Sequence, residues 1–295
     1  MEESRLEQLF QEGRQSEALA LLEQAVSGNP AAPLAHLNLA NAWARVGQWD
    51  LALAGWLKSL EFDPALEVAL HNLALAYQQR GAQDEAARYW ERLLSLNPRS
   101  EEALLCSASL CCERGMYDEA EKKLLALSEL NPGNYMARNN LGIVYRQSNR
   151  SAKAIAEFER SIALFDGYPV AHYNLGLLYL ESGRLEEAER AFRRALALDN
   201  RYADAQLSLG LVYRRQNRTE EAKKALLKTL ALAPEHRLAH YNLGLMFLDA
   251  REIDQAIAFF ERSAKEGLDS PLLYYHLGLC YYYKPLLPRQ SAPET

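Results

Sequence analysis

One pattern of small and large residues returns every 34 residues through this 295-residue chain. The stretch 169–202, PVAHYNLGLLYLESGRLEEAERAFRRALALDNRY, shows the pattern in full. Gly176 and Tyr179 lie at helical spacing in its first half, and Ala188 and Phe192 do so in its second half, after a Ser-Gly-Arg break. We predict two helices folded into a hairpin. Gly176 and Ala188 lie where the helices cross, and the aromatic rings fill the remaining space.

The repeat keeps its register without an insertion or a deletion along the chain. The small residue of the first helix is, in successive units, Ala40, Ala74, Ala108, Gly142, Gly176, Gly210, Gly244 and Gly278. Its partner in the second helix is Ala18, Ala52, Ala86, Ala120, Ala154, Ala188, Ala222 and Ala256. A solenoid grows by adding units rather than by enlarging one core, so we predict one elongated all-α domain.

The predicted solenoid covers residues 1–283, and a Pro-rich tail follows over 284–295. Residues 1–32 depart most from the pattern, and we interpret them as an N-terminal cap. Residues 271–283 form a half unit, because prolines in the tail end the pattern before a second helix can begin. The complete units are 33–66, 67–100, 101–134, 135–168, 169–202, 203–236 and 237–270.

Charge and composition argue against several classes of protein. The net charge of -6 is too mild to imply a nucleic-acid partner, although residues 135–168 carry five basic against three acidic groups and residues 203–236 six against four. The N-terminus has no apolar signal core, and no run approaches the roughly 18 apolar residues that a membrane span needs. Four cysteines without a spaced disulfide framework suit a reducing compartment. We therefore expect a cytoplasmic protein without nucleic-acid or membrane partners.

A 34-residue helix-turn-helix with Leu-Gly-x-x-Tyr, a later Ala, an aromatic residue and a frequent closing proline resembles the tetratricopeptide repeat. The resemblance covers nearly the whole chain. It implies an α-α superhelix of antiparallel helix hairpins that holds other proteins. The closing prolines are Pro30, Pro64, Pro98, Pro132 and Pro234, whereas Asp166, Asn200 and Leu268 stand at that position in three other units.

Polar groups that could suggest catalysis have structural interpretations. Acidic pairs recur in the first turn of the second helix, where negative charge complements the helix dipole: Asp84-Glu85, Asp118-Glu119, Glu186-Glu187 and Glu220-Glu221. His36, His172 and His240 stand at the fourth repeat position, where we expect packing between helices. No histidine is paired with Cys or a carboxylate at metal-ligand spacing. We expect no catalytic residue, metal or cofactor.

The sixth repeat position indicates a binding surface, because five units place an amide there. These residues are Asn38, Asn72, Asn140, Asn174 and Asn242. In this family that position faces the concave surface, and the pattern resembles the asparagine ladder of O-linked N-acetylglucosamine transferases. An amide can donate to and accept from the backbone of an extended peptide. The alternative interpretation is that these are solvated helix residues retained by repeat duplication.

Neighbouring positions make the same predicted groove partly apolar and partly basic. Tyrosines at the fifth position are Tyr173, Tyr241 and Tyr275, and leucines at the ninth include Leu177, Leu211 and Leu245. Arg146 and Arg214 at the twelfth position and Arg215 at the thirteenth could pair with acidic side chains or a carboxylate terminus. Some relatives bind the tails of chaperones through a clamp of specific side chains, and we do not assign that specificity to this chain. It needs Lys and Asn at the fifth and ninth positions of its first unit, and only Asn41 matches, since Leu37 replaces the Lys.

The half unit leaves an apolar face without its usual cover, because terminal units of a solenoid normally carry polar outer faces. The Pro-rich tail, further sequence in a longer chain, or a second copy could cover that face. We predict a non-enzymatic scaffold that binds an extended segment of a partner protein. The arginines of the groove would suit an acidic segment. Two alternatives stay open: the substrate-recognition arm of a larger glycosyltransferase-like enzyme, and a self-assembling structural protein that associates through its last helix.

Overall fold

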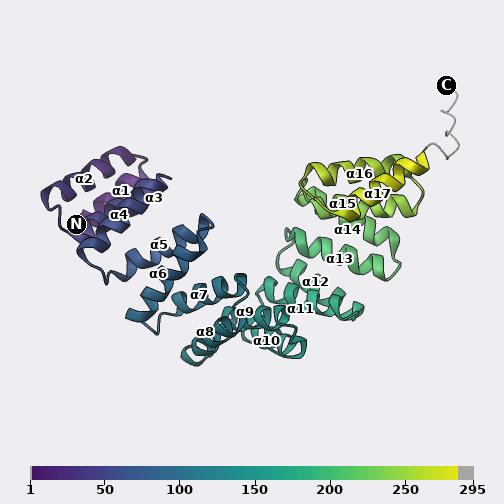
Figure 1. The fold of residues 1–295 in the computed structure, drawn as a ribbon, viewed down its shortest axis with the longest axis horizontal. Coiled ribbons are helices and arrows are strands. Elements are labelled where there is room, and N and C mark those ends of the chain that lie inside the picture. The colour runs from purple at the N-terminus through teal and green to yellow at the C-terminus, as the bar shows by residue number, and fades with distance from the viewer. Residues whose placement is uncertain (1, 285–295) are drawn as a thin grey trace, which may run out of the picture. The chain divides into compact units, whose positions relative to one another are not determined.

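The computed structural model describes residues 2–284, and the regular elements in that range are all α-helices (Figure 1). The tail predicted for 284–295 lies outside the described residues, apart from Lys284. The helices are α1 (Glu2–Gln11), α2 (Gln15–Gly28), α3 (Pro33–Arg45), α4 (Trp49–Phe62), α5 (Glu67–Gln79), α6 (Gln83–Leu96), α7 (Glu101–Glu113), α8 (Tyr117–Leu130), α9 (Tyr135–Gln147), α10 (Ser151–Leu164), α11 (Pro169–Glu181), α12 (Leu185–Leu198), α13 (Ala203–Arg215), α14 (Thr219–Leu232), α15 (Arg237–Asp249), α16 (Ile253–Lys265) and α17 (Pro271–Tyr283).

The helices follow the predicted repeat register. The first helices α3, α5, α7, α9, α11, α13, α15 and α17 begin at the residues where the sequence pattern starts each unit, and each has 13 residues. The acidic pairs lie in the first turns of α6, α8, α12 and α14, as predicted. The all-α repeat fold is therefore confirmed. Within residues 2–284, no helix combines the length and the apolar character that crossing a membrane requires.

The chain divides into two compact units, residues 1–148 and residues 149–295. In the first unit, α3 contacts α4, α5 contacts α6 and α7 contacts α8, and each second helix also contacts the next first helix. In the second unit the hairpins are α11 with α12, α13 with α14, and α15 with α16. The continuity of one solenoid across residues 1–283 stays a prediction.

The close helix crossings lie at the predicted small residues. A Cβ atom built on Gly176 of α11 would lie 2.7 Å from Cε1 of Phe192, and one built on Gly244 of α15 would lie 2.7 Å from Phe260. Both phenylalanine rings are fully buried. The glycine therefore sets the distance between the two helices and the ring fills the space, as the sequence predicts.

The turn between the two helices of a hairpin needs one residue in the left-handed region. Gly47, Gly81, Gly115 and Gly183 have φ between 74° and 79° there. Three non-glycine residues adopt the same conformation at φ 59–60°: Asn149, Asn217 and Arg251. Asparagine tolerates this region, whereas arginine has no local side-chain hydrogen bond to offset the clash of its Cβ.

Arg251→Gly is therefore expected to raise the free energy of unfolding by about 1 kcal/mol, because it removes this backbone strain. Urea unfolding followed by circular dichroism measures the change. Arg251→Ala is the matched control, since it removes the charge and keeps Cβ. Equal stabilisation by both variants would show that the charge, and not the backbone conformation, is responsible.

Several second helices are followed by a hydrogen-bonded turn that does not involve the closing prolines. Asp63, Asn97, Asn131 and Asp199 each follow a second helix, and each Oδ1 accepts a hydrogen bond from the backbone N–H two residues later. The same turn occurs after α12, where Asn200 stands in place of proline. An Asx turn therefore ends these helices with or without the proline.

Candidate functional site

Helical spacing places the predicted binding residues on one face of each first helix. At 100° per residue the fifth, sixth, ninth, twelfth and thirteenth positions share one side of the helix within about 120°, and the fifth and twelfth positions border the small eighth position. We call this side the first-helix face. In the second unit it comprises Tyr173, Asn174, Leu177, Leu211, Arg214, Arg215, Tyr241, Asn242, Leu245 and Tyr275. In the first unit the predicted members are Asn38, Asn72, Asn140 and Arg146.

Arg214 and Asn242 join two neighbouring first helices in the second unit. Nη1 of Arg214 donates a hydrogen bond to Oδ1 of Asn242 at 2.9 Å. Nδ2 of Asn242 donates in turn to the backbone carbonyl of Leu238 at 2.8 Å, and the Asn242 side chain is 8% exposed. The buried amide therefore fixes the half-buried guanidinium at the surface of α13 and α15, which leaves further N–H donors of Arg214 for a ligand.

Tyr241 makes a similar connection to the last helix. Nδ1 of His276 lies 2.7 Å from the carbonyl of Leu272 and 3.2 Å from the Tyr241 hydroxyl oxygen. Only a protonated Nδ1 can bond a carbonyl, so the Tyr241 oxygen accepts from the same N–H. Burial raises the pKa of Tyr241, which keeps its hydroxyl protonated at neutral pH.

Tyr173 is half-buried beside two rings of its own unit. Its ring centroid lies 4.9 Å from that of Tyr202 and 5.9 Å from that of Phe192. Burial raises the pKa of Tyr202. Asn174, next to Tyr173, is buried at 7% exposure. This corner of the face is thus mostly occupied by contacts within the fold.

The remaining members of the face are accessible. Leu177, Leu211 and Leu245 are half-buried on three successive first helices. Arg215 is exposed, and its Nη1 donates to the carbonyl of Leu180 on α11 at 2.7 Å. Tyr275 on α17 is exposed. Apolar and basic groups therefore reach the surface on the same side of α11, α13, α15 and α17.

In the compact unit of residues 1–148, the predicted asparagines lie in three different surroundings. Asn38 is exposed, whereas Asn72 and Asn140 are half-buried. Nδ2 of Asn72 donates to Oδ1 of Asn41 at 2.8 Å, and Nδ2 of Asn139 donates to Oδ1 of Asn140 at 3.2 Å. Arg146, also half-buried, lies on α9.

Asn41 and Trp56 form a group that the sequence pattern does not single out as a binding site. The indole Nε1 of Trp56 donates to Oδ1 of Asn41 at 2.8 Å, and the same oxygen accepts from Asn72. A cleft of about 400 Å³ beside them is lined by Phe10, Asn38 and Arg45 among others. A Trp partner can only donate, so it fixes the orientation of the Asn41 amide. The ninth-position amide, unique among the units, is the signal that could have identified it.

The histidines at the fourth position have a recurring role. Nε2 of His36 lies 2.8 Å from the carbonyl of Pro30, that of His172 3.1 Å from the carbonyl of Asp166, and that of His240 2.9 Å from the carbonyl of Pro234. The bond spans six residues in each case. His172 and His240 are also buried, so their predicted packing role is confirmed, and the structure adds that the ring ties each first helix to the preceding turn.

A second cleft lies at the His172 turn in the second unit. It has a volume of about 520 Å³, and its lining includes Asp166, His172 and Arg194. Arg194 pairs with Asp166, and this hydrogen bond holds the pKa of the Asp166 carboxyl below its ordinary value. Two of the charged groups that line this cleft, Asp166 and Arg194, are therefore paired with each other. In the described part of the chain, no three His, Cys, Asp or Glu side chains cluster as metal ligands.

Comparisons with known proteins agree with the repeat fold. A family model described as a tetratricopeptide repeat matches more than half of the chain, at residues 8–66, 112–169 and 207–271. Three further tetratricopeptide models match residues 176–217, 145–194 and 68–100. A search of curated proteins gave no significant match.

Several solved structures are similar in fold. A tetratricopeptide repeat protein from Parabacteroides merdae has a TM-score of 0.70 at 19% identity, with 84% of this chain and 98% of that chain covered. The APC/C hetero-tetramer Cut9-Hcn1 has a TM-score of 0.70 at 19% identity, covering 94% of this chain and 54% of that chain. Yeast Tom70 gives 0.67 at 19% identity, covering 92% and 59%. This chain therefore spans little more than half the length of the last two.

Proposed function

Because this chain belongs to the tetratricopeptide repeat family, we propose that it is a non-enzymatic scaffold that binds an extended segment of a partner protein on its first-helix face. Proteins with this repeat fold generally serve as scaffolds for protein-protein interaction. The similar Cut9-Hcn1 structure is itself of a hetero-tetramer.

One observation carries the proposal, namely the unequal burial of the two sides of the first helices in the second unit. Residues facing the second helices, such as Gly176, are enclosed by side chains. Leu177, Leu211 and Leu245 are left half-buried on the other side. An apolar strip that recurs at one repeat position on the surface supports binding to a partner, because burying such a strip is favourable only on association.

Charge supports an acidic partner segment. Arg214 is held in place by the buried Asn242, so it loses little side-chain freedom when a carboxylate binds. Arg215 adds a second guanidinium on the same helix. We therefore propose that the bound segment places apolar side chains against the leucines and acidic side chains near α13.

The test uses peptides selected from a displayed library of random sequences against the full chain. Leu211→Ser combined with Leu245→Ser is expected to weaken the selected peptides tenfold or more. Burying a leucine contributes about 1.5–3 kcal/mol, and about 1.4 kcal/mol is a factor of ten. Isothermal titration calorimetry measures the affinity, and the selected peptides should be enriched in Asp and Glu.

The matched control is Leu164→Ser combined with Leu227→Ser, which changes exposed leucines of the second helices α10 and α14. This variant should bind the peptides as the unchanged chain does. Equal affinity of the first-helix variant, or an equal loss in the control, would refute the assignment of the binding face.

A further inference from the structure

The last described helix, α17, keeps the residues of a first helix, and within residues 2–284 no second helix follows to cover them. Gly278 stands at the small position, and nothing lies within 4 Å of a Cβ built there. The corresponding Gly176 and Gly244 each meet a phenylalanine of the following helix. Tyr281 is 48% exposed, whereas its equivalents Tyr179 and Tyr213 are 9% and 6% exposed.

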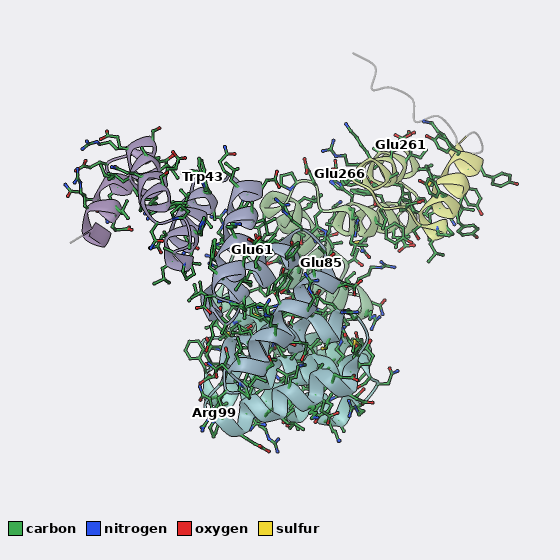
Figure 2. All side chains as sticks on the ribbon, turned by 60° about the vertical axis from the view of Figure 1, so that its left-hand side comes forward. Trp43, Glu61, Glu85, Arg99, Glu261 and Glu266 are labelled. Atoms are coloured by element: carbon green, nitrogen blue, oxygen red, sulfur yellow. The ribbon has the colours of Figure 1, made fainter. Side chains whose placement is uncertain are left out.

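The exposed side of α17 is a continuous tyrosine face with a glycine at its centre. Tyr274, Tyr275, Gly278, Tyr281 and Tyr282 follow the spacing of one helix side. The opposite side, with Leu273 and Cys280, is buried. Tyr281 is positioned by its hydroxyl, which donates to Glu261 of α16 at 2.6 Å. Figure 2 labels Glu261 beside Glu266 at this end of the described chain. We call these five residues the α17 face.

We propose that the α17 face binds the same face of a second copy of this chain, as a two-fold symmetric pair of α17 helices. This inference does not depend on peptide binding, because Tyr274, Gly278 and Tyr281 lie on the side of α17 that would normally contact a second helix. Tyr275 and Tyr282, at the fifth and twelfth positions, border the first-helix face. The small Gly278 lets two identical helices approach closely at their crossing point, and the tyrosines of each helix fill the space beside it.

The absence of charge on α17 favours pairing with the α17 of a second copy over contact with a charged helix. Alone among the helices of residues 2–284, α17 contains no Asp, Glu, Lys or Arg. A head-to-tail contact would instead place it against α1, whose sequence EESRLEQLFQ carries three glutamates. Pairing α17 with α17 brings together two helices without charged side chains of their own, and the adjoining carboxylate of Glu261 is hydrogen-bonded by Tyr281. It also closes the assembly at two chains.

The area of the α17 face is close to the lower limit for such a contact. Its four tyrosines are 48–67% exposed. A buried aromatic side chain covers about 150–250 Å², so the exposed parts of these four present about 340–570 Å² per chain. Two faces together bury about 700–1,150 Å², a range that includes the lower limit of about 1,000 Å² for a specific interface and indicates a weak, reversible pair.

Sedimentation velocity of the full chain over a range of concentrations tests the proposal. We expect a reversible shift from the mass of one chain to that of two. Tyr282→Glu should abolish the shift, because it places a charge within the apolar contact. Tyr283→Glu is the matched control. Tyr283 is 43% exposed but lies about 100° around the helix from Tyr282, so this variant should still pair.

Gly278→Cys tests the symmetry. Two-fold related cysteines at the crossing should form a disulfide-linked pair on mild oxidation, since disulfides need Cα atoms within about 7 Å. Circular dichroism melts verify that each variant stays folded. A single-chain mass at every concentration would overturn the proposal, and so would an open series of larger assemblies without the cross-link, which indicates head-to-tail contact.

Discussion

Phe192→Ala is expected to lower the free energy of unfolding by about 3–5 kcal/mol, the largest effect of any single change considered for this chain. The ring is 0% exposed and lies against the crossing point of α11 and α12. Truncation leaves a cavity that the glycine on the opposite helix cannot fill, because Gly176 has no side chain. The loss therefore combines the transfer of the ring to water with an unfilled void.

The measurement is urea unfolding followed by circular dichroism, combined with amide hydrogen exchange. In a repeat protein each hairpin contacts only its neighbours, so protection should fall most in α11, α12 and the adjoining helices. Leu227→Ala, on the exposed side of α14, is the control and should change stability by no more than about 0.5 kcal/mol. A uniform loss of protection over the second unit would contradict the nearest-neighbour account.

The reverse change at the same crossing should also be destabilising. Gly176→Val is expected to cost about 3 kcal/mol, because a Cβ there lies 2.7 Å from the buried Phe192 ring and the branched side chain adds two further carbons. The helices must separate or the ring must leave its rotamer. Since Val favours a helix more than Gly does, the intrinsic propensity of the new residue cannot explain a loss.

Gly278→Val is the matched control, since it makes the same exchange at the same repeat position, where the structure leaves the space open. Unfolding in dilute solution, where chains do not associate, should show no loss of stability. Thermal melts of both variants measure the difference. If the two variants lost equal stability, the cost would come from the helix itself and not from the crossing.

From the sequence, the five asparagines of the sixth position are predicted to line the binding site. Their shared repeat position suggests a shared role in peptide contact. The structure instead leaves Asn38 exposed and buries Asn174 and Asn242. Asn242 is engaged by Arg214 of the preceding first helix. Peptide contact by these amides stays a prediction, whereas Leu177, Leu211 and Leu245 are the accessible members of the face.

The sequence by itself determined the hairpins, their register and the residues at each crossing. These follow from helical periodicity and side-chain volume, which depend on neighbours along the chain and repeat identically in every unit. Only the tertiary structure decided which polar groups are consumed within the fold, such as the Asn41 oxygen shared by Trp56 and Asn72. The exposure of Tyr281, in contrast, agrees with the uncovered half unit that the sequence predicts. Hydrogen bonds and burial depend on groups from other helices, and identical positions in a repeat have different neighbours in space.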